Sequence, residues 1–356
     1  MVSNSSGRER TVRGRKIRSD RHVKERRRAK KERQKTTKGN GTSRSNDADS
    51  GGRRQRDPLR SPDDVRPDPF VQTDAVDSLS DRIQRWLAAD QPVHVIGPTG
   101  CGKTALALSA AADHGRPVVW IDGDEAVDTT TLTGAHAGGE KYVEDDRYVS
   151  GVHKHTEVVR ERWVDNPLSV AAREGATLVY NEFSRSDPAA HNVLLSVFEE
   201  GVLERPRKRG DDRKIDVHPE FRAILTSNTA EYAGVHEPQD ALLDRMVGVY
   251  VDYYDVETER EIVAAHVDVP DALVETVVDT TRTLRDELGV VVGTRVAITA
   301  AKGMAIFDDA NAGGDRTVDE DVLSTVFTDV LSPKVAGDDE HGHTLEDLEA
   351  TISSAI

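Results

Sequence analysis

A glycine-rich turn near residue 100 constrains this chain more than any other feature. Residues 93–104 read Val-His-Val-Ile-Gly-Pro-Thr-Gly-Cys-Gly-Lys-Thr, which contains the spacing G-x-x-x-x-G-K-[ST]. An apolar run precedes the turn, and the alanine-rich residues 105–112 follow it. Because an apolar run predicts a strand and an alanine-rich run predicts a helix, the expected order is strand, turn and helix. This context predicts a phosphate-binding loop.

The residue types of this turn suit a polyphosphate. Glycines let the backbone N–H groups curl around an anion, and the start of the following helix adds a positive partial charge. We expect the Lys103 ammonium to reach the β- and γ-phosphates and the Thr104 hydroxyl to ligate Mg²⁺. The predicted nucleotide-binding residues are Gly97, Pro98, Thr99, Gly100, Cys101, Gly102, Lys103 and Thr104. The motif alone predicts nucleotide binding and leaves hydrolysis open; a strand–helix turn with no ligand is the alternative.

Charge is distributed unevenly along the chain. The 356 residues carry a net charge of −16, yet residues 1–38 hold sixteen basic and only four acidic side chains. The rest is therefore strongly acidic. In the whole chain, Arg outnumbers Lys by 35 to 13. A dense carboxylate surface keeps a protein hydrated in molar salt, where the Debye length is roughly 3 Å. This composition is typical of a halophilic archaeal protein; an ordinary acidic cytosolic protein is the alternative.

The basic N-terminal segment has few large apolar residues. We predict that residues 1–69 form a disordered basic tail and linker, since they cannot bury enough surface to offset chain entropy. The tail is either a solvated counterweight to the acidic body or a contact for an acidic protein. Nucleic acid ranks behind both, because no aromatic residue interleaves the charges of residues 1–38.

Cysteine content and hydropathy favour a cytoplasmic protein. The single cysteine, Cys101, excludes an intramolecular disulfide framework. No apolar run approaches the roughly 18 residues of a membrane span, so none is predicted.

Beyond the tail, the sequence predicts an α/β core over residues 70–254. Strands are expected at 93–97, 117–121, 176–180 and 221–228, and helices at 73–89, 166–175 and 191–199. This alternation predicts a parallel sheet between helices. Residues 128–155 have no clean period and are predicted to be mobile loops, with histidines 136, 153 and 155 as exposed loop residues rather than metal ligands.

A different pattern follows residue 255. Helices without intervening strands are expected at 257–266, 272–288 and 294–306, which predicts a small helical domain over residues 255–332. Residues 333–356 are predicted to be an acidic, weakly patterned C-terminal tail.

Several segments together resemble AAA+ ATPases of the MoxR-like group, and in particular its gas vesicle members. They are the glycine-rich turn, Trp-Val-Asp-Asn at 163–166, Thr-Leu-Val-Tyr-Asn-Glu-Phe at 177–183, Asn-Val-Leu-Leu-Ser-Val at 192–197, Thr-Ser-Asn at 226–228, Glu-Tyr-Ala-Gly-Val-His at 231–236 and Gln-Asp-Ala-Leu-Leu-Asp-Arg-Met at 239–246. The last two are the most specific. The resemblance covers roughly residues 70–310 and implies an AAA+ core followed by a helical lid.

The resemblance implies catalytic roles for four further residues. Glu182 falls where the Walker B glutamate acts as general base, and Asn228 falls at the sensor-1 position that orients the attacking water. Arg245 falls where such proteins place an arginine finger that reaches a neighbouring subunit, and Arg295 matches the sensor-2 arginine of the lid. Guanidinium groups there neutralise charge on the transferred phosphoryl group.

One position departs from the family pattern. The Walker B aspartate is replaced by Asn181, which offers Mg²⁺ an oxygen but no charge. We therefore expect Mg²⁺ at Thr104 with weak help from Asn181, and slow hydrolysis of ATP rather than none.

The resemblance also implies partners. The leading hypothesis is an ATP-driven homo-oligomeric ring, cytoplasmic and associated with gas vesicles, that remodels or places other gas vesicle proteins, with residues 134–139 as a candidate contact. A MoxR-like chaperone that activates a metalloenzyme is the alternative client assignment. A nucleotide-binding scaffold with little turnover and a DNA-associated ATPase are two further hypotheses.

Overall fold

The computed structural model describes residues 57–146, 154–206, 208, 210–228, 239–307, 318–335 and 344–356. The predictions for the basic tail up to residue 56 and the Glu-Tyr-Ala-Gly-Val-His segment at 231–236 lie outside these ranges. Within them, every helix is too short or too polar to cross a membrane.

The main sheet has the strand order β1-β3-β6-β9-β2-β10. Its strands are β1 (Leu59–Arg60), β2 (Val93–Gly97), β3 (Val118–Asp122), β6 (Thr177–Asn181), β9 (Arg222–Asn228) and β10 (Val247–Tyr250). All neighbours pair in parallel except β1, which runs antiparallel to β3. The carboxyl ends of β2, β3, β6 and β9 therefore meet at one edge, and the predicted parallel α/β core is confirmed.

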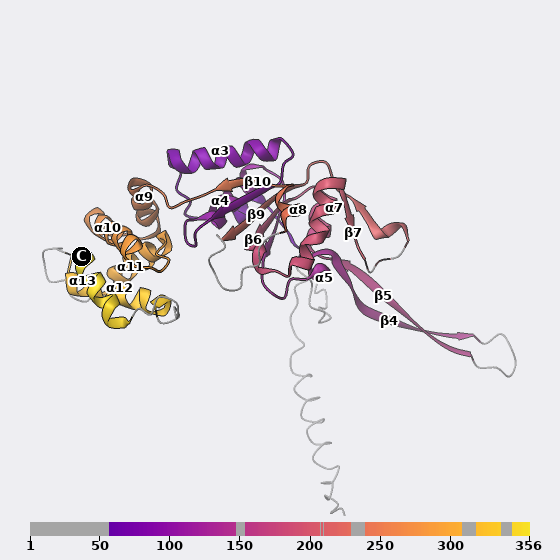
Figure 1. Cartoon of the computed structure of the whole chain (residues 1–356). Helices are drawn as coiled ribbons and strands as arrows, with labels where there is room; N and C mark the ends of the chain where they lie inside the picture. Colours follow the sequence, from indigo (N-terminus) through magenta and orange to yellow (C-terminus); the bar gives the residue numbers. More distant parts are fainter. Residues whose placement is uncertain are drawn as a thin grey trace, which may run out of the picture. The chain divides into compact units, whose positions relative to one another are not determined.

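Helices cover both faces of this sheet, as alternation along the strands requires. In β6, Leu178 and Tyr180 join one buried cluster and Val179 joins the other. The first cluster includes apolar residues of α6 (Pro167–Glu174) and α7 (Asn192–Glu200), and the second those of α3 (Asp74–Ala88) and α4 (Lys103–Asp113). Figure 1 shows α3 and α4 in indigo and α7 in magenta around the strands. Shorter helices are α2 (Pro62–Val65), α5 (Thr129–Thr133) and α8 (Asp240–Leu243), with 3₁₀ turns η1 (Phe183–Arg185), η2 (Pro188–His191) and η3 (Asp211–Arg213).

Two antiparallel ribbons stand outside the main sheet, and the longer corrects the loop prediction. Strands β4 (Gly134–Asp146) and β5 (Lys154–Asp165) pair along their length (Figure 1). Residues 134–139 thus belong to a strand, where a Cβ on Gly134 would lie 2.7 Å from the Trp163 ring. His136 is exposed, as predicted, and its ring meets Trp163 edge-on. The shorter ribbon pairs β7 (Val202–Glu204) with β8 (Lys214–Asp216).

The residues after 255 form helices that share one hydrophobic cluster, drawn in orange and yellow in Figure 1. They are α9 (Val256–His266), α10 (Asp271–Glu287), α11 (Thr294–Phe307), α12 (Glu320–Val335) and α13 (Leu345–Ala355). The expectation of a weakly patterned tail after 333 is wrong for α13. Thr344 and Asp347 form a capping box at its start, and Leu348 and Ile352 are fully buried among the other helices.

Candidate nucleotide-binding site

The glycine-rich turn connects β2 to α4 in the predicted way. Gly100 and Gly102 have φ of 85° and 93°, the left-handed region that glycine adopts without steric cost. Lys103 is buried and its ammonium donates to the carbonyls of Gly97 (2.9 Å) and Pro98 (2.6 Å). Burial lowers the pKa of this lysine. The cation is thus held over the turn, where a phosphate oxygen can replace the carbonyl partners.

Asn181 lies at the centre of a hydrogen-bond network at the carboxyl edge of the sheet. Its Oδ1 accepts from the hydroxyl of Thr104 at 2.7 Å and from that of Thr226 at 2.9 Å. Its Nδ2 donates to Asp122 Oδ1 at 3.0 Å. The two residues predicted to hold Mg²⁺, Thr104 and Asn181, are therefore in direct contact.

Glu182 follows at once in a strained backbone conformation. Its φ of 49° is in the left-handed region, which is costly for a residue with a side chain. The Thr226 hydroxyl accepts from its backbone N–H at 3.0 Å, while Arg185 Nη1 donates to its carboxylate at 2.7 Å. The candidate general base is thus positioned by β9 and paired with an exposed arginine.

Asn228 and Arg295 line one cavity of about 440 Å³ together with Lys103, Thr104, Asn181 and Glu182. Asn228 ends β9 directly beside Gly97, its partner in the β2–β9 register. Arg295 is the second residue of α11 and lines the cavity from the lid side. Among the described residues, its guanidinium makes no hydrogen bond. The cavity is lined by Thr99, Gly100, Gly102, Lys103, Thr104, Asn181, Glu182, Thr226, Asn228 and Arg295, among others.

Arg245 is the one predicted catalytic residue that does not join this cavity. It precedes β10, whose first residue Val247 pairs with Val93 at the start of β2. The glycine-rich turn follows the other end of β2, roughly 13 Å along the strand. Arg245 donates through Nε at 3.0 Å, and through Nη2, to Glu199 at the end of α7. Its own chain therefore keeps it at the opposite edge of the sheet.

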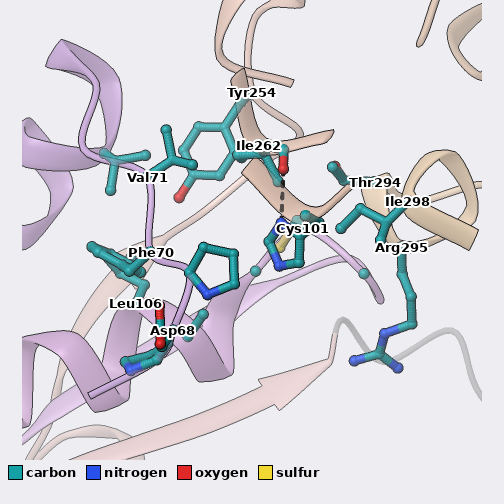
Figure 2. Close-up of a pocket in the computed structure, with 17 residues that line it drawn as sticks. Asp68, Phe70, Val71, Cys101, Leu106, Tyr254, Ile262, Thr294, Arg295 and Ile298 are labelled. Carbon is teal, nitrogen blue, oxygen red and sulfur yellow. Dashed lines mark hydrogen bonds between the residues drawn. The ribbon is translucent and has the colours of Figure 1, made fainter. Parts of the chain in front are cut away.

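A second, more apolar cavity of about 420 Å³ adjoins the first and was not foreseen from the sequence. Figure 2 shows Phe70 and Val71 on one side, Ile298 and Arg295 on the other, and Cys101 between them. Tyr254 and Ile262 complete the apolar lining, and burial raises the pKa of the Tyr254 phenol. Gly100, Gly102, Ala105 and Arg295 line both cavities.

The paired cavities fit a nucleotide. The apolar one suits a nucleoside, and the polar one offers the turn, a lysine and an arginine to phosphates. The Thr104 and Asn181 side-chain oxygens are ligand types that Mg²⁺ accepts, and a nucleotide-bound Mg²⁺ takes several of its other ligands from water and phosphate. In the described ranges, no cluster of three His, Cys, Asp or Glu residues could hold a metal by itself.

Three polar residues of the site carried no predicted role of their own. Asp122 was visible only as the residue after a predicted strand, and Thr226 only as part of a family segment. The only sequence indication for Arg185 was its position three residues after Glu182, a spacing that allows an ion pair between the two side chains.

Comparisons with known proteins agree with this site. Residues 92–246 match the AAA domain of the dynein-related subfamily. The gas vesicle ATPase GvpN of Haloferax mediterranei is 51% identical, with 98% of this chain and 97% of that protein covered. GvpN2 of Halobacterium salinarum is 52% identical, over 93% of this chain and 92% of that protein. Protein CbbQ of Hydrogenophilus thermoluteolus is 25% identical, over 56% of this chain and 67% of that protein.

The two gas vesicle relatives come from haloarchaea, in agreement with the halophilic composition. Since identity above 50% extends over nearly the whole length of both proteins, the chain belongs to the GvpN family of gas vesicle ATPases, within the AAA+ proteins.

Proposed function

We propose that the chain binds ATP with Mg²⁺ in the two adjoining cavities and hydrolyses it. The observation that carries this proposal is the convergence of Lys103, Thr104, Asn181, Glu182, Asn228 and Arg295, from both core and lid, on one polar cavity.

The binding residues have separate roles. Lys103 exchanges its carbonyl partners, Gly97 and Pro98, for the β- and γ-phosphate oxygens. Thr104 and Asn181 hold Mg²⁺ through their side-chain oxygens, and the ion supplies charge neutralisation on the phosphates. Arg295 reaches the same phosphates from the lid, so nucleotide binding draws on both domains.

Hydrolysis requires a base and an oriented water. Glu182 accepts the proton of the attacking water, and Asn228 orients that water at the end of β9. Glu182 must first leave Arg185, with which it pairs at 2.7 Å. Because Asn181 also brings no charge to the metal, we expect slow turnover.

Arg245 completes the site of a neighbouring subunit in a homo-oligomeric ring. Its place at the opposite edge of the sheet from its own phosphate turn supports this assignment. A head-to-tail ring brings that edge of one subunit to the cavity of the next, which is the contact that an arginine finger needs.

The ring acts in gas vesicle assembly, in the cytoplasm and at the vesicle, by remodelling or placing other gas vesicle proteins. Family membership supports this part of the proposal. A metalloenzyme-activating chaperone is a second candidate, because the sequence segments that resemble gas vesicle ATPases also resemble the MoxR-like group as a whole. Neighbouring genes separate them: genes for small hydrophobic shell proteins favour the first, and an enzyme operon favours the second.

The direct test measures phosphate release and mass together in molar KCl, with and without ATP. We expect slow release by the wild type, background release by Glu182→Gln and Lys103→Ala, and a ring mass with ATP. Glu182→Gln should still bind nucleotide, whereas Lys103→Ala should not. Equal background rates in all three proteins would contradict hydrolysis and favour a nucleotide-binding scaffold.

A further inference from the structure

The neutral Asn181 has a carboxylate beside it on the neighbouring strand. Asp122 ends β3 and is the register partner of Asn181 at the end of β6. Asn181 Nδ2 donates to Asp122 Oδ1 at 3.0 Å, and Trp120 Nε1 donates to the same oxygen at 2.9 Å. The charge that is missing from the Walker B position is therefore present one strand away.

This contact selects one orientation of the Asn181 amide. A carboxylate can only accept hydrogen bonds, so the NH₂ group of Asn181 must face Asp122. The opposite end of the amide, Oδ1, then faces the hydroxyls of Thr104 and Thr226. With the amide reversed, two acceptors would face each other across 3.0 Å, and the NH₂ group would point toward the metal position.

We propose that Asp122 is a positioning residue for Mg²⁺: it holds the Asn181 oxygen toward Thr104 and supplies the negative charge that asparagine lacks. The inference rests on the proposed nucleotide-binding function. Mg²⁺ keeps several of its waters in proteins, so a carboxylate next to a ligand can act without touching the ion. Such outer partners typically contribute about 10- to 100-fold to metal affinity.

The same geometry explains why aspartate does not suit position 181 in this chain. An Asn181→Asp change alone would set two carboxylates within hydrogen-bond distance, and like charges that close oppose ionisation of both. A reciprocal exchange, Asp122→Asn with Asn181→Asp, keeps one carboxylate and one amide in the pair. The pair, rather than either residue alone, is thus the unit to be tested.

The test measures binding rather than turnover. A fluorescent ATP analogue is titrated against each protein in molar KCl at increasing Mg²⁺, and the Mg²⁺ concentration that gives half of the affinity gain is recorded. The variants are Asp122→Ala, Asp122→Asn, the reciprocal double variant, and Glu125→Gln as a matched loss of one exposed carboxylate nearby. Thermal unfolding without nucleotide checks that each protein is folded.

We expect Asp122→Ala to raise this Mg²⁺ concentration about tenfold or more, and Asp122→Asn to raise it less, because asparagine keeps an acceptor for the Asn181 amide. The double variant should return close to the wild type, and Glu125→Gln should not differ from it. Two results overturn the inference while wild-type binding depends on Mg²⁺. One is that Asp122→Ala needs the same Mg²⁺ concentration as the wild type; the other is that the double variant needs as much Mg²⁺ as Asp122→Asn. A wild type whose binding ignores Mg²⁺ instead overturns the proposed function.

Discussion

The two edges of the main sheet carry different parts of the chemistry. At the carboxyl edge, strands β2, β6 and β9 bring Lys103, Asn181 and Asn228 to one cavity. At the amino edge, Arg245 is bound to Glu199 and faces no phosphate of its own chain. Under the proposed function, the first edge binds the nucleotide and the second acts on a neighbouring subunit. On that proposal, one subunit has a complete binding site but an incomplete catalytic site.

The largest expected effect lies at the amino edge. Arg245→Ala should lower turnover by about 10³- to 10⁵-fold, as loss of an arginine finger does, because it removes charge neutralisation from a neighbouring site. Nucleotide affinity of the isolated subunit should not change. Phosphate release and equilibrium binding, with the exposed Arg85→Ala as control, check both statements. Weakened nucleotide binding by the monomer would place Arg245 in the site of its own subunit and contradict a role across subunits.

A somewhat smaller loss is expected at the carboxyl edge. Glu182→Gln should lower turnover by about 10²- to 10⁴-fold, since glutamine cannot accept the proton of the attacking water. It should also retain bound ATP, which mass measurement of the nucleotide-bound ring detects. Turnover within twofold of the wild type would assign the base to another residue.

The lid contribution should be smaller again. Arg295→Ala should weaken nucleotide affinity about 10- to 100-fold, the value of a hydrogen bond to a charged group. Lys302→Ala, an exposed cation on the same helix α11, is the matched control and should leave affinity unchanged. Equal nucleotide affinities of Arg295→Ala and Lys302→Ala would show that the lid does not contribute to nucleotide binding at the carboxyl edge.

The last prediction concerns the interior of the sheet between the two edges, and it affects the stability of the fold rather than the nucleotide site. Burial lowers the pKa of His94 to about 4, and its Nε2 lies 2.8 Å from the Ser227 hydroxyl. The unfolded chain protonates His94 near pH 6.5, whereas the folded chain does so only near pH 4. Protonation of His94 therefore does not lower the stability of the fold above pH 6.5. The stability falls as the pH drops toward 4, by about 3 kcal/mol at most.

Chemical denaturation of the wild type and His94→Gln between pH 7 and 4.5 tests this expectation. The variant should lose less stability than the wild type over this interval. Parallel curves would show that His94 titrates alike in the folded and the unfolded state, which would contradict the expectation.

Sequence patterns within single segments predicted much of the fold and of the site. The pairing register between strands that are distant in the sequence could not be predicted from such patterns. The roles of Glu182 and Asn228 could be predicted from the family resemblance, whose segments lie at the carboxyl ends of two predicted strands. Asp122 follows a strand as well, but its contact with Asn181 depends on a parallel register between segments 59 positions apart. No local period encodes that register.

Among the elements that the sequence did not predict, the β4–β5 ribbon and helix α13 were missed for different reasons. The β4–β5 ribbon lies outside the main sheet and does not need the apolar alternation that reveals a half-buried strand. Helix α13 did have a signal, since Thr344 and Asp347 have capping spacing ahead of Leu348 and Ile352. The signal was overlooked because Glu346, Asp347 and Glu349 resemble the acidic composition of the rest of the chain.

The most direct test of the divided site mixes two inactive proteins, Arg245→Ala and Glu182→Gln, in equal amounts before ring assembly. Each interface in which the first variant provides the cavity and the second provides the arginine is intact. Random assembly makes such interfaces about a quarter of the total, so phosphate release should recover to about that fraction of the wild-type rate. Release no higher than the mean of the two separate variants would contradict an arginine that acts across subunits.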